Sequence, residues 1–313
     1  MREAVVRTTR MRHGALALLG LLLAAPIARP CLAQDPQGAW TVPTTSPWAL
    51  GQAQSGRVAF TENDATTGTL FDAGGGVAGP ARTVGLFARM VESTDDSLFV
   101  IVAGGPTLRK YTRAGTLVRS VTLGGFADIP RRILPLDDGR VLLAFTNSNP
   151  ARVLKIFDRN CVAVDSIPTV YFDGATGTVV GLARAPGGDV VTCVETVMGN
   201  FFLTRYGADG TVRWNVPIVA GGSIATDSRG AVYVCHGANA TSLDVYGETG
   251  VPAASWTGPP GDPLVRVSDV VTSADGQLLF VLTNASSGPV RVFTSLPVPA
   301  ARRTWGEVKT GRR

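Results

Sequence analysis

Five polar residues hold the same place in a repeated pattern of the sequence, each shortly after a run of apolar residues. Their amide and carboxylate oxygens suit a hard cation such as Ca²⁺, although asparagine is also common in tight loops for conformational reasons alone. We predict that they surround one mouth of a ligand-binding channel, either with such a divalent cation or with no cofactor. They are Asn63, Asn147, Glu195, His236 and Asn284.

Catalysis through a histidine would have to use a single residue. His236 is the only histidine beyond the first 33 residues, so a Ser-His-Asp triad or an imidazole-rich metal site would depend on it. The sequence also has no Gly-x-Ser-x-Gly turn that would present a nucleophilic serine. We therefore predict no catalytic residue.

Paired carboxylates occur at Asp95-Asp96 and at Asp137-Asp138, and Asp275 lies in a similar turn. Aspartate closes such turns by accepting hydrogen bonds from the backbone that follows it. Because these turns belong to different repeats, we expect the pairs to point outward. They should have a structural role rather than act together on a glycosidic bond.

Two landmarks recur six times and identify the elements that carry these residues. The first is an apolar cluster, which returns at intervals of 40, 43, 49, 42 and 46 residues. The second is an aromatic residue 13 to 16 positions after the second residue of each cluster. Two landmarks in step indicate one supersecondary unit repeated six times. The clusters begin at Arg57, Ser97, Arg140, Asp189, Ala231 and Gln277. The aromatic residues are Phe71, Tyr111, Phe157, Tyr206, Tyr246 and Phe293.

Each repeat has the pattern of four short strands joined by Gly, Asp and Asn turns. Four strands in roughly 40 to 45 residues is the size of one β-propeller blade, and a ring of blades buries the faces that a single blade leaves open. We predict an all-β, six-bladed β-propeller of four-stranded antiparallel blades over residues 34–300. Pro297 and Pro299 interrupt the last strand of the sixth blade, so a strand at 38–42 is expected to complete it.

The first 33 residues have the features of a secretory signal peptide. Arginines precede an apolar segment of about eleven residues, and Cys31-Leu32-Ala33 offers a cleavage site. The apolar segment is shorter than the roughly 20 residues of a membrane-spanning helix. We predict cleavage and export to the periplasm, the extracellular space or the cell envelope, with a retained anchor as the alternative.

The positive charge of the chain is concentrated at its ends. The signal peptide and the basic C-terminal tail 301–313 together carry more positive charge than the net +5 of the whole chain. The body between them is slightly acidic, so we predict no nucleic-acid partner. No later segment is long and apolar enough to span a membrane. The scarcity of lysine beside abundant arginine and alanine is typical of a GC-rich bacterial genome.

Three cysteines follow the signal peptide, at Cys161, Cys193 and Cys235. Cys193 and Cys235 hold equivalent places in neighbouring repeats, where the separation is too large for a disulfide bond. We predict that both are small buried apolar side chains.

The fifth repeat carries a family motif. Its Ile224-Ala225-Thr226-Asp227, Gly230, Val232-Tyr233-Val234 and Leu243-Asp244-Val245-Tyr246 segments resemble the NHL-type repeat, a hairpin followed by a strand and a Gly turn. The sixth repeat matches in part, at Val290-Arg291-Val292-Phe293. The resemblance implies a propeller and specifies the fold more than the function.

More distantly, the sequence is similar to the gluconolactonase and regucalcin propellers, which are also six-bladed. That family binds a divalent cation near the channel through a Glu and several Asn or Asp residues, which here implies Asp269 and Glu195 as metal ligands. Ser268-Asp269 matches one ligand position of the family. The equivalent places in three other blades hold Gly222-Ser223, Gly177-Thr178 and Ile129-Pro130.

We predict an exported, non-catalytic β-propeller that binds a protein, a glycan or another ligand through one face of the ring. The alternative is a divergent metal-dependent hydrolase, similar to a lactonase or esterase, that uses Asp269, Glu195 and asparagines at the channel. The hydrolase needs several oxygen ligands converging on the axis, and the binding module does not. A structural cell-envelope component, anchored by Trp256, Trp305 and Phe126, is a third possibility.

Overall fold

The computed structural model describes residues 41–294, except for 43–46, 55, 63–66, 73–75, 80–81, 85–87, 103–104, 125–128, 147–152, 169–176, 238–239, 260 and 284–289. The predicted signal peptide and C-terminal tail lie outside the described residues.

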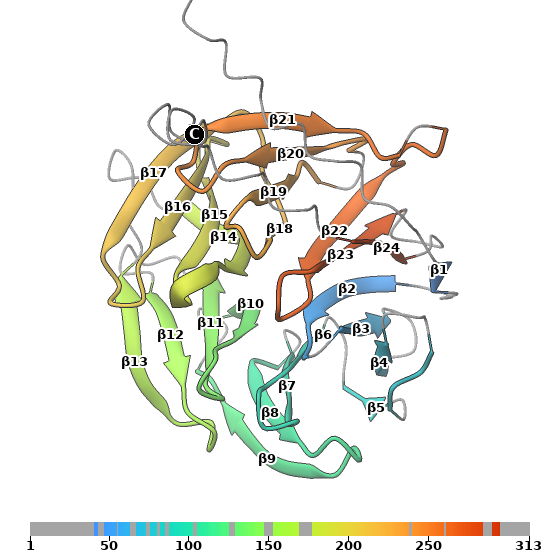
Figure 1. Cartoon of the computed structure of the whole chain (residues 1–313). Helices are drawn as coiled ribbons and strands as arrows, with labels where there is room; N and C mark the ends of the chain where they lie inside the picture. Colours follow the sequence, from blue (N-terminus) through green and yellow to red (C-terminus); the bar gives the residue numbers. More distant parts are fainter. Residues whose placement is uncertain are drawn as a thin grey trace, which may run out of the picture.

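Six four-stranded antiparallel sheets stand around a central axis as the blades of a propeller (Figure 1). Each blade runs from an innermost strand beside the axis to an outermost strand at the rim, which confirms the predicted fold class. The innermost strands are β2 (Pro47–Gln52), β6 (Ala88–Glu92), β10 (Ile129–Pro135), β14 (Gly177–Arg184), β18 (Ile224–Thr226) and β22 (Val267–Thr272). The second strands are β3 (Arg57–Glu62), β7 (Leu98–Val102), β11 (Val141–Thr146), β15 (Val190–Thr196), β19 (Val232–Cys235) and β23 (Leu278–Thr283).

The third and outermost strands complete the blades. The third strands are β4 (Thr67–Asp72), β8 (Thr107–Tyr111), β12 (Val153–Phe157), β16 (Phe201–Tyr206), β20 (Leu243–Tyr246) and β24 (Val290–Thr294). The outermost strands are β5 (Arg82–Thr83), β9 (Leu117–Thr122), β13 (Ala163–Pro168), β17 (Val212–Ile218), β21 (Pro252–Trp256) and β1 (Thr41–Val42). A short 3₁₀ turn, η1 (Pro186–Gly188), joins β14 to β15.

The ring is closed by a strand from the beginning of the chain. β1 pairs antiparallel with β24, with Thr41 opposite Arg291 and Val42 opposite Val290. The sixth blade is therefore built from both ends of the propeller, as the prolines near its own last strand predicted.

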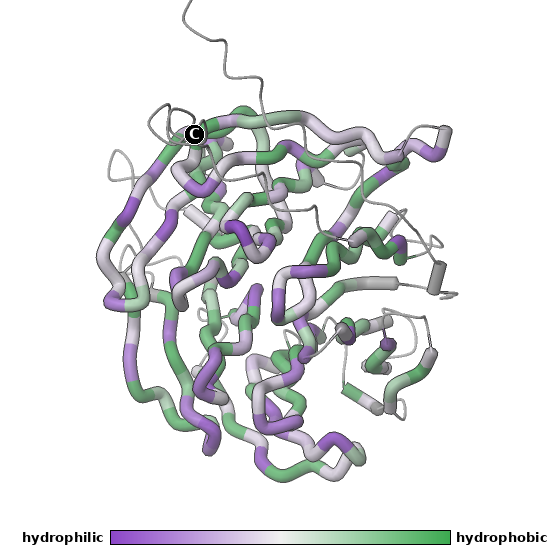
Figure 2. Tube along the Cα trace, in the orientation of Figure 1, coloured by the Kyte–Doolittle hydropathy of each residue, from purple (hydrophilic) through white to green (hydrophobic). Residues whose placement is uncertain are grey.

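Both repeated landmarks fall where the predicted blade requires them. The apolar clusters form the second strands and the aromatic residues lie on the third strands. All five residues of β7 are buried. Leu98 and Val100 pack towards the first blade, while Phe99 and Ile101 pack towards the third. This second strand is apolar throughout because blades cover both of its faces. In Figure 2 hydrophobic stretches lie along the strands, while several of the turns are hydrophilic.

The core is divided into six apolar clusters, one at each interface between neighbouring blades. The cluster that joins the last blade to the first contains Phe60 of β3 and Phe280 of β23, both almost fully buried. Blade stacking around the ring thus supplies the apolar burial that an isolated four-stranded sheet lacks.

The aspartates in the turns between the innermost and second strands have the structural role that was predicted. Asp95, Asp138 and Asp275 each accept a hydrogen bond from the backbone N–H two residues later, at 3.0 to 3.1 Å. The expected outward orientation is wrong for Asp137, which forms an ion pair with Arg184 at one mouth of the channel. This difference arises because the turns of the inner strands surround the axis rather than the rim.

The three described cysteines are free and buried, so Cys193 and Cys235 are small buried side chains as predicted. Burial raises the pKa of the Cys161 thiol to about 11 and the pKa values of the Cys193 and Cys235 thiols to about 12. The thiolate is the reactive form. We therefore expect negligible reaction of the native protein with a thiol reagent at pH 8.

The matching measurement in guanidinium chloride also tests the signal peptide. The whole sequence has four cysteines, one of them in the predicted signal peptide, so cleaved protein should release three thiols on denaturation and uncleaved protein four. Rapid labelling before denaturation would contradict the buried state of these residues.

In the part of the chain that the structure describes, no helix is long and apolar enough to cross a membrane.

Candidate binding site in the central channel

Irregular pairing of the inner strands places charged side chains at the axis. β10 has a register shift between Pro130 and Arg132, and β22 has one between Val267 and Asp269. An extra residue of this kind redirects the side chain that follows it. Arg132 and Asp269 therefore line the channel, together with Arg89 of β6.

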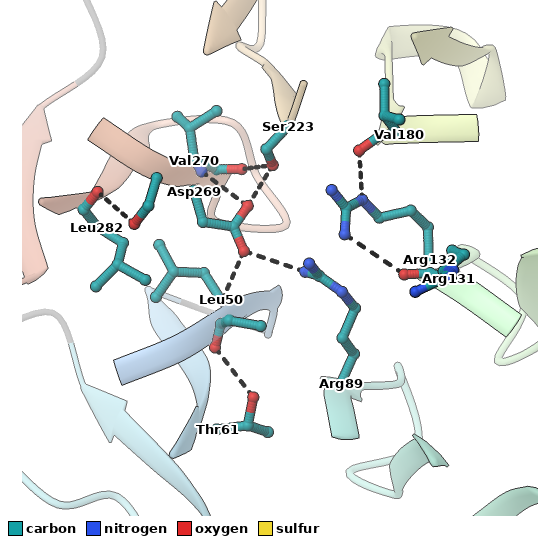
Figure 3. Close-up of polar contacts among 12 residues, drawn as sticks. Leu50, Thr61, Arg89, Arg131, Arg132, Val180, Ser223, Asp269, Val270 and Leu282 are labelled. Carbon is teal, nitrogen blue, oxygen red and sulfur yellow. Dashed lines mark hydrogen bonds and ion pairs between the residues drawn. The ribbon is translucent and has the colours of Figure 1, made fainter. Parts of the chain in front are cut away.

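The carboxylate of Asp269 is the centre of this site (Figure 3). One oxygen accepts hydrogen bonds from the Leu50 N–H at 3.0 Å and from a guanidinium nitrogen of Arg89 at 3.1 Å. The other accepts bonds from the Ser223 hydroxyl and from the Val270 N–H. These donors come from the first, second, fifth and sixth blades, so one side chain links four of the six blades.

Asp269 remains ionised in this setting. Burial raises the pKa of its carboxyl group, but the positive charges of Arg89 and Arg132 and the hydrogen bonds from Ser223 and Leu50 lower it by more. The net result is a pKa below the usual range. Asp269 is therefore a buried anion whose negative charge is stabilised by hydrogen-bond donors from four blades.

Arg132 is held by neutral groups. Its Nε donates to the carbonyl oxygen of Val180 in the next blade at 2.6 Å, and another guanidinium nitrogen lies 3.4 Å from the carbonyl oxygen of Arg131. Burial and the like charge of Arg89 lower the pKa of Arg132 to about 9, while Asp269 acts in the opposite direction. The guanidinium is still charged at neutral pH.

Two cavities follow the axis. The first lies between Arg89, Arg132, Ser223 and Asp269 and has a volume of about 30 Å³. The second, of about 180 Å³, lies at the opposite mouth among the turns that follow the inner strands. Gln52 lines both cavities.

Arg184 crosses the mouth that the second cavity occupies. It donates to the carbonyl oxygen of Ala274 in the sixth blade at 2.7 Å and forms its ion pair with Asp137 of the third. This arginine therefore narrows the turn side of the channel.

The structure describes only part of the predicted ring of loop residues. Asn63, Asn147 and Asn284 lie outside the described residues. Glu195 is exposed near the end of β15, and His236 directly follows β19. The His236 Nε2 contacts a carboxylate oxygen of Asp244 at 2.9 Å, which connects this loop to the third strand of its own blade. The gathering of the five residues around one mouth stays a prediction.

Asp269 is a poor fit for the divalent cation that the lactonase resemblance implies. A carboxylate offers about four lone-pair positions, and those of Asp269 meet four donors. Two guanidinium groups beside it would also repel a cation. The other predicted metal ligand, Glu195, is exposed on the second strand of its blade, whereas Asp269 lies on an innermost strand. Among the described residues, no group of three or more His, Cys, Asp or Glu side chains could hold a metal ion.

Arg89, Arg132 and Ser223 were not predicted as site residues. A signal was present, because arginine interrupts the apolar pattern of two innermost strands, within Ala88–Glu92 and Ile129–Pro135. That interruption indicates a polar channel. It does not indicate that the two arginines meet the same aspartate.

Comparison with known proteins identifies relatives in fold only. No protein-family model matches the chain, and no curated protein matches it in sequence. The hydrazine synthase of Kuenenia stuttgartiensis is similar, with 13% identity and a TM-score of 0.58 over 81% of this chain and 97% of that one. A gluconolactonase of Xanthomonas campestris is similar, with 14% identity and a TM-score of 0.58 over 88% of this chain and 93% of that one.

A streptogramin B lyase also has this fold, with 11% identity and a TM-score of 0.55 over 82% of this chain and 98% of that one. The predicted resemblance to gluconolactonase-type propellers is thus confirmed as a likeness in architecture. Proteins of such different names share it, so the fold does not by itself assign an activity.

Proposed function

We propose that this protein is an exported, non-catalytic binding module that recognises a protein, a glycan or another ligand at the mouth of the channel where the inner strands begin. The observation that carries the proposal is that the two oxygens of the Asp269 carboxylate accept four hydrogen bonds, from donors in four blades. A carboxylate in this state fixes the blades relative to one another. It has no free lone pair for a metal ion or for a substrate proton.

A rigid ring with loops at each mouth suits recognition. The blade interfaces are closely packed, and loops carried on such a scaffold commonly provide binding residues. Export is proposed from the features of the first 33 residues, and the partner would then be met outside the cytoplasm.

A lactonase-like hydrolase is the second candidate, because a gluconolactonase shares the fold over most of both chains. This activity would use a divalent cation held by oxygen ligands near the axis. In this chain Asp269 would have to leave its four donors to become such a ligand, and Arg89 and Arg132 would oppose the approaching cation. These costs favour the binding module.

The test is a hydrolysis assay on lactones and esters with Ca²⁺, Mg²⁺, Mn²⁺ or Zn²⁺, beside thermal melts in each metal and in EDTA. We expect no turnover and no metal-dependent shift of Tm. A metal site filled at 100 times its dissociation constant would add about 2.7 kcal/mol, or about 5 to 10 °C, to the stability of a chain of this size.

Two exposed carboxylates allow a matched comparison in this assay. Metal-dependent turnover that Glu195→Gln abolishes and Glu248→Gln leaves unchanged would replace the binding module with the hydrolase. Both side chains are exposed, so neither substitution is expected to disturb folding.

A further inference from the structure

The first cavity of the channel has an excess of positive charge. Arg89 and Arg132 direct their guanidinium groups towards the same space (Figure 3). Asp269 is the single carboxylate among the described residues that line it. Among these described residues two positive charges therefore face one negative charge, which leaves an excess of one positive charge.

The unmatched charge belongs mainly to Arg132. Arg89 has an ion pair with Asp269 at 3.1 Å, whereas the described hydrogen bonds of Arg132 go to the backbone oxygens of Val180 and Arg131. A partly buried charge whose hydrogen bonds go to neutral groups is unfavourable unless an anion or water compensates it. The pKa of Arg132 is lowered for the same reason, because burial disfavours the charged form of the guanidinium.

The size of the cavity limits what can compensate the charge. A volume of about 30 Å³ is enough for about two water molecules. The two oxygens of one carboxylate would replace two waters, and its single negative charge would balance the excess. A phosphate or sulfate group carries more oxygens and more charge than this space requires.

We propose that the channel binds one carboxylate group of its ligand between Arg89 and Arg132. The planar fork of a guanidinium matches the two oxygens of a carboxylate. Asp269, which accepts a hydrogen bond from the Ser223 hydroxyl, pairs with Arg89 and fixes its position. This inference rests on the proposed binding function, because it names the chemical class that the binding module recognises.

The rest of the ligand would extend towards the mouth where the inner strands begin. Arg89 is the second residue of β6, and Ser223 immediately precedes β18, so the site lies near that end of the channel. The opposite end is crossed by Arg184. We therefore place the entrance for a carboxylate at the end of a longer molecule on the side nearer to the site.

The test measures binding of sodium acetate to the purified protein by titration calorimetry, at constant ionic strength, with sodium chloride and sodium sulfate as competitors. We expect saturable acetate binding that chloride and sulfate displace weakly. Equal displacement by chloride would mean a general site for small anions, and no saturable binding would also overturn the proposal.

Three variants assign the binding to this place. Arg132→Gln should weaken acetate binding about tenfold or more, because it removes a charged donor. Arg132→Lys keeps the charge without the fork and should bind with intermediate affinity. Arg119→Gln makes the same change on the exposed strand β9 and should bind as the original protein does. If Arg132→Gln does not fold, the competition experiment and Arg132→Lys still decide the question.

Two larger probes distinguish the sources of a carboxylate. Glucuronate represents an acidic sugar, and N-acetylalanine represents the end of a peptide. Tighter binding of one than of acetate identifies the class of ligand. Absence of carboxylate binding without lactone hydrolysis overturns this inference and leaves the binding module. Lactone hydrolysis overturns the proposed function whether or not carboxylates bind.

Discussion

Replacing Asp269 with alanine should lower the free energy of unfolding by about 3 to 5 kcal/mol, because it leaves buried charges and donors without their acceptor. The carboxylate accepts hydrogen bonds from Arg89, Leu50, Ser223 and Val270. Its loss disconnects four blades at one point. Urea denaturation of Asp269→Ala, Asp269→Asn and the original protein measures the effect.

The free energy of unfolding of Asp269→Asn should fall between those of the original protein and Asp269→Ala, since asparagine keeps the shape and one acceptor oxygen. Asp165→Asn is the matched control, because Asp165 is an exposed carboxylate on β13 whose described hydrogen bond comes from the neighbouring Ser166 N–H. If Asp269→Ala is as stable as Asp165→Asn, the Asp269 carboxylate does not stabilise the contacts between the blades.

The same comparison has a definite dependence on pH. The folded-state pKa of Asp269 is lowered, so its stabilising contribution is complete above the unfolded pKa of about 3.9 and is lost as the pH falls through the folded value. The stability difference between the original protein and Asp269→Asn should therefore be constant from about pH 5 to 8 and decrease in stronger acid.

Replacing Gly51 with alanine should be the other severe change, with a loss of about 3 kcal/mol or more from overpacking. A Cβ added at Gly51 would lie 1.7 Å from the carbonyl oxygen of Met90 and 2.9 Å from its carbonyl carbon. Both atoms belong to the backbone of β6 in the neighbouring blade. The blades can accommodate the methyl group only if the first and second blades separate. The shift in the urea midpoint measures the cost.

Gly105→Ala is the control for this prediction, because an added Cβ there meets no atom within 4 Å. A movement of β6 would also displace Arg89, which precedes Met90. We therefore expect Gly51→Ala to weaken acetate binding as well as to lower stability. Equal stabilities of the two variants would mean that the blades are not in the close contact that the structure describes.

The candidate site was predicted less completely than the fold. Asp269 was selected as a metal ligand through a family resemblance, and the structure surrounds it with donors instead. Arg89 and Arg132 were missed, since their role depends on contacts between blades. Arg89 and Asp269 are 180 positions apart in the sequence, and Leu50 and Asp269 are 219 apart. No local pattern connects residues at such distances.

The sequence by itself determined the number of blades, their four strands and the origin of the closing strand. These features depend on local turn chemistry and on apolar runs that repeat with the blade, so they can be recognised without the partner surfaces. The tertiary structure alone decided which side chains face the axis. Register shifts in the inner strands turn Arg132 and Asp269 into the channel, and closure of the ring brings Arg89 and Asp269 together from the second and sixth blades.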